Sequence, residues 1–446
     1  MHLIIAGGGE VGFALAQALA AEHDVFVIDH DPSIADRFEP LDVQFLLGSA
    51  TGAETLQRAG IEKAAFLVAC TGLDEVNIVT CALASQLGKP RTVCFISRED
   101  FLQLPGTEEG LGRFGIGRLL WPEAQLAADI ERIVVSPGAI DAEEFAGGAV
   151  RLLEYRLEPH SPLTLRPLAE VHLPHGALAV AVRRGDRFFI PRGDTRLAPG
   201  DKTIFMGTPE AMAEVQQRLA VRRDATRQQV TIIGGGDVGL RLAERLESRP
   251  SVDVRIVESD QARGEMLAAR LRRALVLQGD GTDLELLEAE DIGRSDVLVS
   301  VIDNDERNLL ASLLGRQLGA RRIITRVSKR ANLRLFERVG IDVAISARGA
   351  AVASVLHQIE GGAASLLAVL EQGAGRILEL VVPAHYAPRA LRDVAPPRDS
   401  IVGAILRGGG AIVPRGTDRI EPGDHLLVFS TEEAADRVRD FFTAPR

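Results

Sequence analysis

Two glycine-rich motifs in the chain have the residue types and the spacing of a phosphate-binding turn. They read GGGEVG at residues 7–12 and GGGDVG at residues 234–239, and both fit the pattern G-x-G-x-x-G. Each follows a short apolar run and precedes a stretch with helical spacing, so free N–H groups and the positive end of a helix would face one anion. The first glycine permits the tight turn, the second lets a pyrophosphate approach, and the third lets the helix pack on its strand. The predicted contacts are Gly7, Gly8, Gly9, Glu10, Val11 and Gly12 in the first motif and Gly234, Gly235, Gly236, Asp237, Val238 and Gly239 in the second.

A carboxylate follows each motif at the distance expected for ribose recognition. Asp29 lies 17 residues after Gly12, and Glu258 lies 19 residues after Gly239. An acid at the end of the second strand can accept hydrogen bonds from both hydroxyls of an adenosine ribose, and it would repel a 2′-phosphate. This favours NAD over NADP. The same geometry would accept ADP or ATP, so the choice among these nucleotides stays open.

Four further polar loops are candidates for contacts with the nucleotide. GSAT at 48–51 and GDGT at 279–282 end the third predicted strands, where a small polar loop can touch the adenine or its ribose, or can form only a turn and a helix N-cap. After each fourth strand, an aspartate can cap the next helix, and an asparagine falls in the first turn of that helix. The predicted positions are Ser49, Ala50, Thr51, Asp74 and Asn77, and Asp280, Gly281, Thr282, Asp305 and Asn308.

The sequence offers no set of side chains for catalysis or for a metal. A dehydrogenase needs a proton donor or acceptor against its substrate, and no His, Lys or Tyr stands out near the motifs in both copies. His2, His23 and His30 are not spaced with Cys, Asp or Glu as metal ligands, and neither a nucleophile elbow nor a Walker sequence occurs. We therefore expect nucleotide binding without catalytic or metal-ligating residues.

An internal repeat accounts for the paired motifs. Gly7 and Gly234 are 227 residues apart, the LDEVN and NDERN segments 231, and the IPRGDTRLAPGD and VPRGTDRIEPGD segments 223. The order of motifs is the same in both copies while the offset drifts, which indicates a tandem duplication with small insertions. The spacing places one insertion at residues 104–112, in the first copy.

Each copy has the pattern of a large α/β domain followed by a small α+β domain. In the large domain, near-continuous apolar strands alternate with helices, which predicts a Rossmann-like, doubly wound parallel sheet covered on both faces. In the small domain, short strands are separated by turn sequences such as RRGD and APGD, and an amphipathic helix follows. The expected domains span residues 1–135, 138–222, 228–360 and 363–446, with a polar linker at 222–229.

Composition narrows the class of partner. The chain has 446 residues, of which 46% are hydrophobic, 25% charged and 4% aromatic, with a net charge of −11. This charge, without basic runs at either end, argues against extensive contact with nucleic acid or anionic lipid. Cys70, Cys81 and Cys94 lie in apolar stretches, which is typical of buried thiols in a reducing compartment. Because the sequence shows neither a signal peptide nor a run of about 18 apolar residues, we expect a cytoplasmic protein.

The ordered motifs resemble those of the TrkA family of Trk-system potassium uptake proteins, which are built from RCK-type TrkA-N and TrkA-C modules. The resemblance extends over nearly the full length. In the first half it rests on IIAGGGEVG, VIDHD, GSAT, LDEVN, WPEAQLAADI, SPGAI and IPRGDTRLAPGD. In the second half it rests on IIGGGDVG, VESD, GDGTDLELLEAEDI, DNDERN, ITRVSKRA, IDVAISA, IVGAILRGGG and IEPGDHLLVF.

The resemblance implies a peripheral protein on the inner face of the cell membrane, forming a homo-oligomeric ring, a tetramer, beneath a membrane-embedded potassium-translocating subunit of the Trk type. Binding of NAD(H), ATP or ADP in the N-type domains would change the shape of the ring and so gate transport. The family pattern adds one binding position, Arg326 in the fifth strand of the second copy. The first copy has Phe95 there, which reduces the anion contacts of that site.

Two other functions are compatible with the motifs. One is an NAD-dependent oxidoreductase that uses one half as its cofactor site. The other is a nucleotide-responsive regulator of a different transporter or channel. The duplicated fingerprint without catalytic groups, together with the resemblance to the TrkA family, favours a regulator of potassium uptake over both.

Overall fold

The computed structural model describes residues 1–21, 23–98, 101, 112–219, 227–329, 332–359, 364–370 and 373–443. The chain divides into two compact units. The first consists of Met1–Leu126 with Ser346–Ile359, and the second of Ala127–Ile345 with Glu360–Arg446. Most of the predicted insertion at 104–112 and most of the predicted linker at 222–229 lie outside the described residues.

The first large domain is a parallel sheet with connecting helices. Its elements are β1 (His2–Ala6), α1 (Glu10–Leu19), β2 (Asp24–Asp29), β3 (Gln44–Leu47), α2 (Ala53–Arg58), β4 (Phe66–Ala69), α3 (Asp74–Leu87), β5 (Arg91–Phe95) and β6 (Arg118–Leu120). The six strands are ordered β3-β2-β1-β4-β5-β6, and every neighbouring pair is parallel. The strand order reverses between β1 and β4, which is where open α/β sheets bind their ligands.

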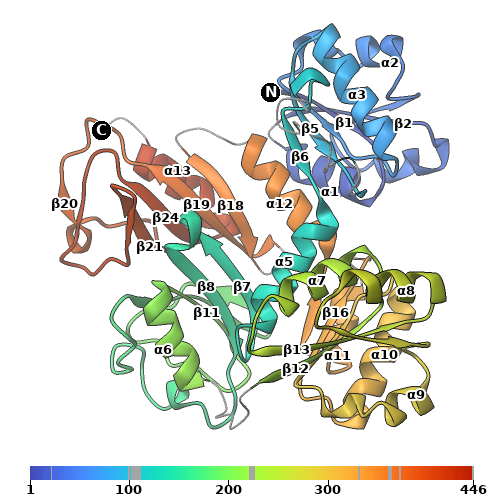
Figure 1. Ribbon diagram of the computed structural model, residues 1–446. Helices are drawn as coiled ribbons and strands as arrows, with labels where there is room; N and C mark the ends of the chain where they lie inside the picture. Colours follow the sequence, from blue (N-terminus) through green and yellow to red (C-terminus); the bar gives the residue numbers. More distant parts are fainter. Residues whose placement is uncertain are drawn as a thin grey trace. The chain divides into compact units, whose positions relative to one another are not determined.

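The second large domain repeats this architecture. Its elements are β12 (Gln228–Ile233), α7 (Asp237–Glu247), β13 (Val252–Glu258), α8 (Gln261–Arg270), β14 (Leu275–Gln278), α9 (Leu284–Ala289), β15 (Val297–Ser300), α10 (Asp305–Leu318), β16 (Ile323–Arg326), α11 (Leu333–Arg338) and β17 (Val343–Ile345). The parallel strands are ordered β14-β13-β12-β15-β16-β17, and Figure 1 shows α7 and α8 on one side of the sheet with α9 and α10 on the other. Both large domains therefore have the Rossmann-like, doubly wound fold that the sequence predicts.

The helix that follows the second large domain in sequence packs elsewhere. This helix, α12 (Ala347–Ile359), belongs to the first compact unit and contacts α1. Its buried residues Ala351, Val355 and Ile359 recur every four positions, which gives the helix one apolar face. The apolar spacing predicts such a face but does not show which surface covers it. The domain range expected from the sequence, 228–360, therefore placed this helix with the residues that precede it in sequence.

The equivalent helix of the first half, α5 (Pro122–Val134), is held to the second large domain by charged groups. Glu131 is 4% exposed and accepts hydrogen bonds from Nε of Arg245, in α7, at 2.5 Å and from Nε of Arg249 at 2.7 Å. The buried guanidinium of Arg322 donates to backbone carbonyls at the end of α5 and just beyond it. Separating buried, paired charges is costly, so α5 is fixed to the second large domain.

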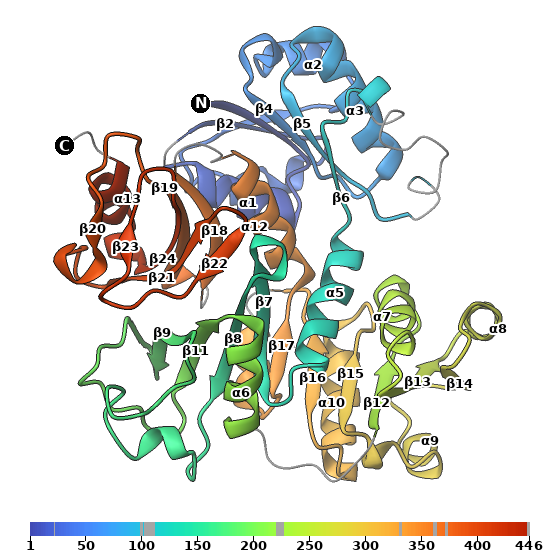
Figure 2. The ribbon, with the colours of Figure 1, turned by 60° about the vertical axis from the view of Figure 1, so that its left-hand side comes forward.

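Each small domain is a five-stranded antiparallel sheet with one helix on it (Figure 2). The first consists of β7 (Ala139–Phe145), β8 (Val150–Arg156), β9 (Ala177–Arg184), β10 (Arg187–Phe189), β11 (Lys202–Gly207) and α6 (Pro209–Leu219). The second consists of β18 (Ala364–Leu370), β19 (Gly375–Val381), β21 (Ser400–Arg407), β22 (Gly410–Ile412), β24 (His425–Thr431) and α13 (Ala435–Thr443), with a short ribbon of β20 (Arg389–Ala390) and β23 (Arg419–Ile420). The small α+β domains are thus present in both copies.

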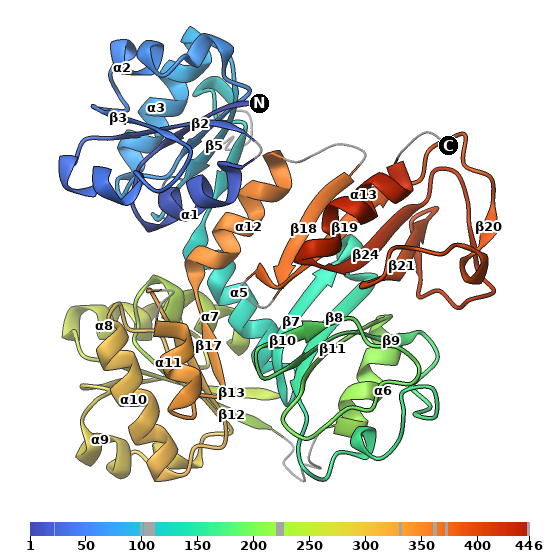
Figure 3. The ribbon, with the colours of Figure 1, turned by 180° about the vertical axis from the view of Figure 1, so that it is seen from behind.

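The two small domains share one hydrophobic core. Strands β9 and β11 of the first domain contact β21 of the second, and the sheets lie side by side in Figure 3. The common core contains Ile204 and Met206 from β11 together with Leu427 and Phe429 from β24. In each sheet these residues alternate with residues on the helix-covered face, as the strand repeat of two requires. The halves of the duplication are therefore joined through their small domains.

Candidate nucleotide-binding sites

The first glycine of each motif has a backbone conformation that other residues rarely adopt. Gly7 has a φ of +113° and Gly234 a φ of +103°. A Cβ on Gly7 would also lie 2.8 Å from the backbone carbonyl of Cys70, in the loop that follows β4. The chain therefore turns sharply at the carboxyl edge of the sheet, against the end of the neighbouring strand.

The last glycine of each motif brings the helix onto this turn. A Cβ on Gly12 would overlap the carbonyl oxygen of Gly7, and a Cβ on Gly239 would overlap that of Gly234. A larger side chain would push the first turn of α1 or α7 away from the strand that precedes it. Backbone contact therefore enforces the motif's spacing in both copies.

The middle glycine of each motif faces open space. A Cβ built on Gly9 or Gly236 meets no described atom within 4 Å. These two residues are the N-caps of α1 and α7, and no side chain among the described residues caps either helix. An uncapped helix start with room beside its backbone can bind a phosphate through N–H groups and the helix dipole. The same anion-binding geometry thus occurs twice.

The acid at the end of each second strand is tied to the glycine turn. Asp29 accepts a hydrogen bond from the N–H of Gly8 at 2.6 Å, and Glu258 accepts one from the N–H of Gly235 at 2.7 Å. The other oxygen of each carboxylate accepts from the N–H two residues further on, at 2.9 and 2.8 Å respectively. Oε1 of Glu258 also accepts from the hydroxyl of Ser259 at 3.4 Å, and Oδ1 of Asp29 lies 3.2 Å from Nδ1 of His30. The oxygen of each acid that faces the glycine turn keeps a second lone pair, so both acids are fixed in place and can still accept from a ribose hydroxyl.

Other positions in the motifs serve packing inside the protein. Val238 is buried and Val11 half-buried. A Cβ on Gly8 or Gly235 would crowd apolar side chains from the segment after the second strand. These four residues pack on the side of the turn that faces the protein interior.

The acids of the motifs are paired with arginines. Glu10 lies 3.1 Å from Nη2 of Arg37, and Asp237 lies 2.7 Å from Nη2 of Arg263. Arg263 also donates from Nε to the carbonyl of Gly235 at 2.7 Å. Sequence reasoning missed Arg263, and the only available signal was a cation five residues after the ribose-type acid Glu258.

The loops after the third strands form side-chain-stabilised turns. In the first copy the hydroxyls of Ser49 and Thr51 are 2.8 Å apart. In the second, Oδ1 of Asp280 accepts from the N–H and the hydroxyl of Thr282 at 2.9 and 2.7 Å, and both carboxylate oxygens lie 2.8 Å from Arg307. The hydrogen bonds from Thr282, followed by Arg307, lower the pKa of Asp280. The turn role foreseen for these loops is therefore present.

The small residues of these loops pack against the end of the first strand. Ala50 is buried and shares an apolar cluster with Ala6. In the second copy the corresponding strand residue is the larger Ile233, and a Cβ on Gly281 would overlap its side chain. The first copy combines a small strand residue, Ala6, with Ala50 in the loop, and the second combines the larger Ile233 with Gly281. Packing against the strand therefore explains both Ala50 and Gly281.

Asp74 and Asp305 do not cap the helices in which they lie, contrary to the sequence-based expectation. The N-caps are the preceding residues, and both aspartates are 5% exposed. The carboxylate of Asp305 accepts from the N–H groups of Ser328 and Lys329 at 2.7 and 3.1 Å and from Nδ2 of Asn332 at 2.8 Å. Asp74 accepts from the two equivalent N–H groups. These acids hold the loop after the fifth strand.

Asn77 and Asn308 are interior clamps between adjacent loops. Asn308 accepts from the N–H of Ile302 at 2.8 Å and donates to the carbonyl of Arg326 at 3.1 Å. Asn77 makes the same pair of bonds in the first copy, and it donates to the carbonyl of Phe95 at 2.9 Å. Both asparagines are at most 1% exposed, so they position the loops around the site. The shared bond also shows that Phe95 and Arg326 are equivalent.

Replacing Asp305 by alanine is expected to lower the free energy of unfolding by about 2–3 kcal/mol near neutral pH, because three part-buried hydrogen bonds to a charged acceptor are lost. Burial by itself raises the pKa of Asp305, but the hydrogen bonds from Ser328, Asn332 and Lys329 outweigh it and leave the pKa below its usual value. This stabilisation is present above the ordinary carboxyl pKa and is lost as the pH falls through the lowered one. Urea unfolding of both proteins should show their difference shrinking below pH about 4. The exposed neighbour Glu306 changed to alanine is the control, and a difference independent of pH would contradict the assignment.

Arg326 lies at the carboxyl edge of the second sheet. Its side chain is 19% exposed and lies 2.9 Å from Asp303, which is 88% exposed. The equivalent Phe95 is buried in the first copy. Asp303 was not foreseen, because nothing in its local sequence indicates a pairing with the end of the next strand.

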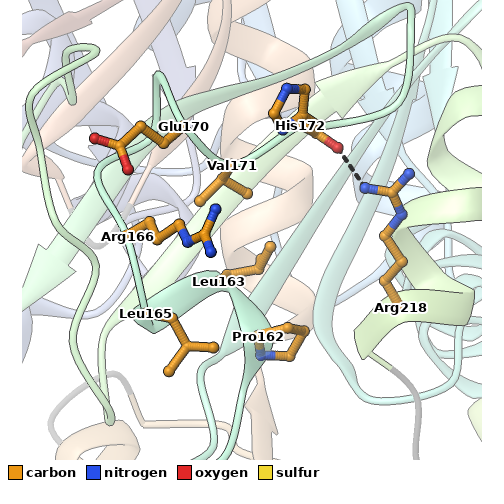
Figure 4. A pocket seen from close by; sticks show the side chains of 8 residues that line it. All are labelled: Pro162, Leu163, Leu165, Arg166, Glu170, Val171, His172 and Arg218. Carbon is orange, nitrogen blue, oxygen red and sulfur yellow. Dashed lines mark hydrogen bonds between the residues drawn. The ribbon is translucent and has the colours of Figure 1, made fainter.

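A cavity of about 300 Å³ lies in the first small domain, apart from the glycine motifs (Figure 4). One of its cations, Arg218, donates to the backbone carbonyl of His172. The cavity is lined by Pro162, Leu163, Leu165, Arg166, Glu170, Val171, His172 and Arg218. It contains none of the predicted site residues, so the candidate sites are those at the glycine turns.

Within the described part of the chain, no three His, Cys, Asp or Glu side chains are grouped so that they could hold a metal ion. No helix in the same residues combines the length and the apolar character needed to cross a bilayer.

Two Rossmann-like domains with glycine turns alternate with two small antiparallel domains, which is the arrangement of a protein built from repeated TrkA-N and TrkA-C modules. The family model of the TrkA-N domain, a nucleotide-binding domain, matches residues 3–116 and 230–347, and that of the TrkA-C domain matches residues 152–220 and 377–443. The chain belongs to the TrkA family of Trk system potassium uptake proteins. This family regulates potassium transport and is not a family of enzymes.

Curated relatives match along the whole chain. The Trk system potassium uptake protein TrkA homolog 1 of Methanosarcina mazei is 37% identical, covering 99% of this chain and 100% of that protein. The Trk system potassium uptake protein TrkA of Halomonas elongata is 33% identical, covering 99% of this chain and 97% of that protein.

Solved structures share the fold at low sequence identity. The GsuK RCK domain has a TM-score of 0.63 and 18% identity, covering all of this chain and 95% of that chain. The GsuK channel bound to NAD has a TM-score of 0.62 and 17% identity, covering all of this chain and 79% of that chain.

Proposed function

We propose that the chain is a nucleotide-responsive regulatory subunit of a Trk-type potassium uptake system, which gates a membrane-embedded potassium-translocating subunit. One observation carries the proposal: a member of the TrkA family keeps both glycine turns open, at Gly9 and Gly236, with Asp29 and Glu258 fixed beside them. The relatives named above are called potassium uptake proteins, and the match to this chain extends over nearly their whole length. The subunit would act at the inner face of the membrane as a homo-oligomeric ring.

The ligand in this proposal is an adenine nucleotide, with NAD(H) first and ATP or ADP as alternatives. Its phosphates would bind at the start of α1 or α7, against the N–H groups beside Gly9 or Gly236. Its ribose hydroxyls would donate to Asp29 or Glu258, which are held in place by the turn itself. A 2′-phosphate would meet these carboxylates, so NADP should bind poorly. A GsuK channel with the same fold is described as bound to NAD.

The packing of the long helices suggests how binding would be transmitted. α1 begins at the first anion site and contacts α12, which precedes the second small domain in sequence. α7 begins at the second anion site and is joined through Arg245 to Glu131 in α5, which precedes the first small domain. A nucleotide that shifts the start of α1 or α7 would therefore move a helix that leads directly into a small domain.

Potassium uptake at low external potassium tests the function. Cells without the gene should take up potassium more slowly, and the intact gene should restore the rate. Genes carrying both Gly9→Asp and Gly236→Asp should fail to restore it, although the protein is present at a normal level. Undiminished potassium uptake in the deletion strain would overturn the proposal, and a defect in the flux of a different ion would favour another transporter as partner.

A further inference from the structure

The two candidate sites differ in charge at one edge. The second site has two arginine–aspartate pairs there, Arg307 with Asp280 at 2.8 Å and Arg326 with Asp303 at 2.9 Å. The Asn77 and Asn308 clamps align the two copies residue by residue at an offset of 231. At that offset the four equivalent residues of the first site are Val76, Ser49, Phe95 and Gly72. In the first site, both members of each ion pair are thus replaced by uncharged residues.

The other cations near the sites do not distinguish them. Arg98 and Lys329 are equivalent and both follow the fifth strand, where an aspartate holds their backbone N–H groups. Arg37 in the first site and Arg263 in the second each pair with the acid in the first turn of the helix. Among the residues that the structure describes around the two sites, the clearest difference in charge therefore lies in the two pairs at Arg307 and Arg326.

The paired arginines are placed to exchange partners. Arg326 is mostly buried, whereas its partner Asp303 is 88% exposed, and Arg307 and Asp280 are 43% and 47% exposed. Exposed ion pairs contribute only about 0–1 kcal/mol, so Arg307 can leave its carboxylate at little cost, and the exposed carboxylate of Asp303 stays solvated when Arg326 leaves it. A terminal phosphate carries more charge than a carboxylate and accepts bidentate hydrogen bonds from a guanidinium.

The location of the Arg326–Asp303 pair suggests which part of a ligand this pair would meet. The loop at 301–303 lies against the first glycine of the turn, because a Cβ on Gly234 would be 3.1 Å from the backbone nitrogen of Ile302. Asp303 follows directly, and Arg326 ends the neighbouring strand β16. A nucleotide with its ribose at Glu258, on the other side of the strand-order reversal, would therefore point its far end toward Arg326.

We propose that the second site is specialised for a nucleotide that ends in phosphate, a nucleoside diphosphate or triphosphate. The first site, which has uncharged residues at the four equivalent positions, takes a dinucleotide whose far half ends in a planar ring. This inference rests on the proposed function, because both ligand classes need the glycine turn and the ribose carboxylate.

Calorimetry on the full chain tests the second site. The Gly9→Asp background leaves only that site for binding, and ADP and NAD are the two probes. Adding Arg326→Phe with Asp303→Gly replaces one of the two ion pairs by the equivalent residues of the first site. We expect the affinity for ADP to fall by about tenfold or more and that for NAD to change by less than about threefold. An equal fall for both nucleotides, or no fall for either, would overturn the inference.

The reciprocal exchange keeps the test decisive if that variant does not fold. In the Gly236→Asp background, Phe95→Arg with Gly72→Asp introduces the equivalent of the Arg326–Asp303 pair into the first site, and a Cβ on Gly72 meets nothing described within 4 Å. The affinity for ADP relative to NAD should rise by about tenfold, and an unchanged ratio refutes the inference. A wild-type chain that binds neither nucleotide would instead overturn the proposed function and this inference with it.

Discussion

Replacing Gly236 by aspartate is expected to lower the affinity of the second large domain for adenine nucleotides by about 100-fold or more, close to 2.8 kcal/mol of binding free energy. The new carboxylate would enter the open space beside the start of α7, where the phosphates of the ligand are proposed to lie. Its charge would oppose that of the phosphates and occupy the positive end of the helix. Calorimetry with NADH, NAD, ADP and ATP on the full chain in a Gly9→Asp background measures the effect.

The fold should tolerate this substitution, so that a loss of binding is informative. Gly236 has φ and ψ of −60° and −171°, which any residue adopts, and no described atom crowds its Cβ. Gly236→Ala serves as the control, because it adds the Cβ without the charge and should bind more tightly than Gly236→Asp. Unchanged affinity for all four nucleotides in the aspartate variant would reject the site.

Gly239→Ala is expected to lower the free energy of unfolding of the second large domain by about 2–4 kcal/mol. At an ordinary helix position the same change would stabilise by up to about 1 kcal/mol, because alanine is the better helix former. Here the added Cβ would overlap the carbonyl oxygen of Gly234, so α7 must move away from β12 or the turn must deform.

Urea unfolding of the full chain, followed by a probe in the second large domain, measures this loss. Gly236→Ala is again the matched control, three residues away in the same motif, and its stability should equal that of the wild type. If the two alanine variants unfold at the same urea concentration, close packing of the helix on its turn is not what requires Gly239.

Local patterns were sufficient to predict the large domains and the centre of each site. Apolar runs and helical spacing predicted the parallel sheets, because both signals depend on neighbouring residues. The glycine spacing predicted the turn, because Gly12 packs on the carbonyl oxygen of Gly7, within six residues of chain. Asp29 and Glu258 lie beside the turns because a parallel sheet aligns the carboxyl ends of adjacent strands.

The remaining parts depend on contacts that are distant in sequence. Asp305 has the position of a helix cap, yet its acceptors serve a loop more than twenty residues away. The apolar face of α12 is visible in its sequence, but the partner surface on α1 is not. Arg263 and Arg307 become candidates only when the fold brings them to the turn and to Asp280, because isolated arginines are common on helix surfaces.

The core shared by the small domains has a consequence for how the chain can evolve. When an interface joins two identical subunits, every substitution appears on both sides at once. Here Met206 of the first half and Gly403 of the second lie next to each other in the shared core, and both are encoded by one gene. A substitution can therefore change one half without changing the other. The peptide chain keeps the two halves in equal number and at high local concentration. The difference between Phe95 in the first copy and Arg326 at the equivalent position of the second is the kind of divergence that such a linkage permits.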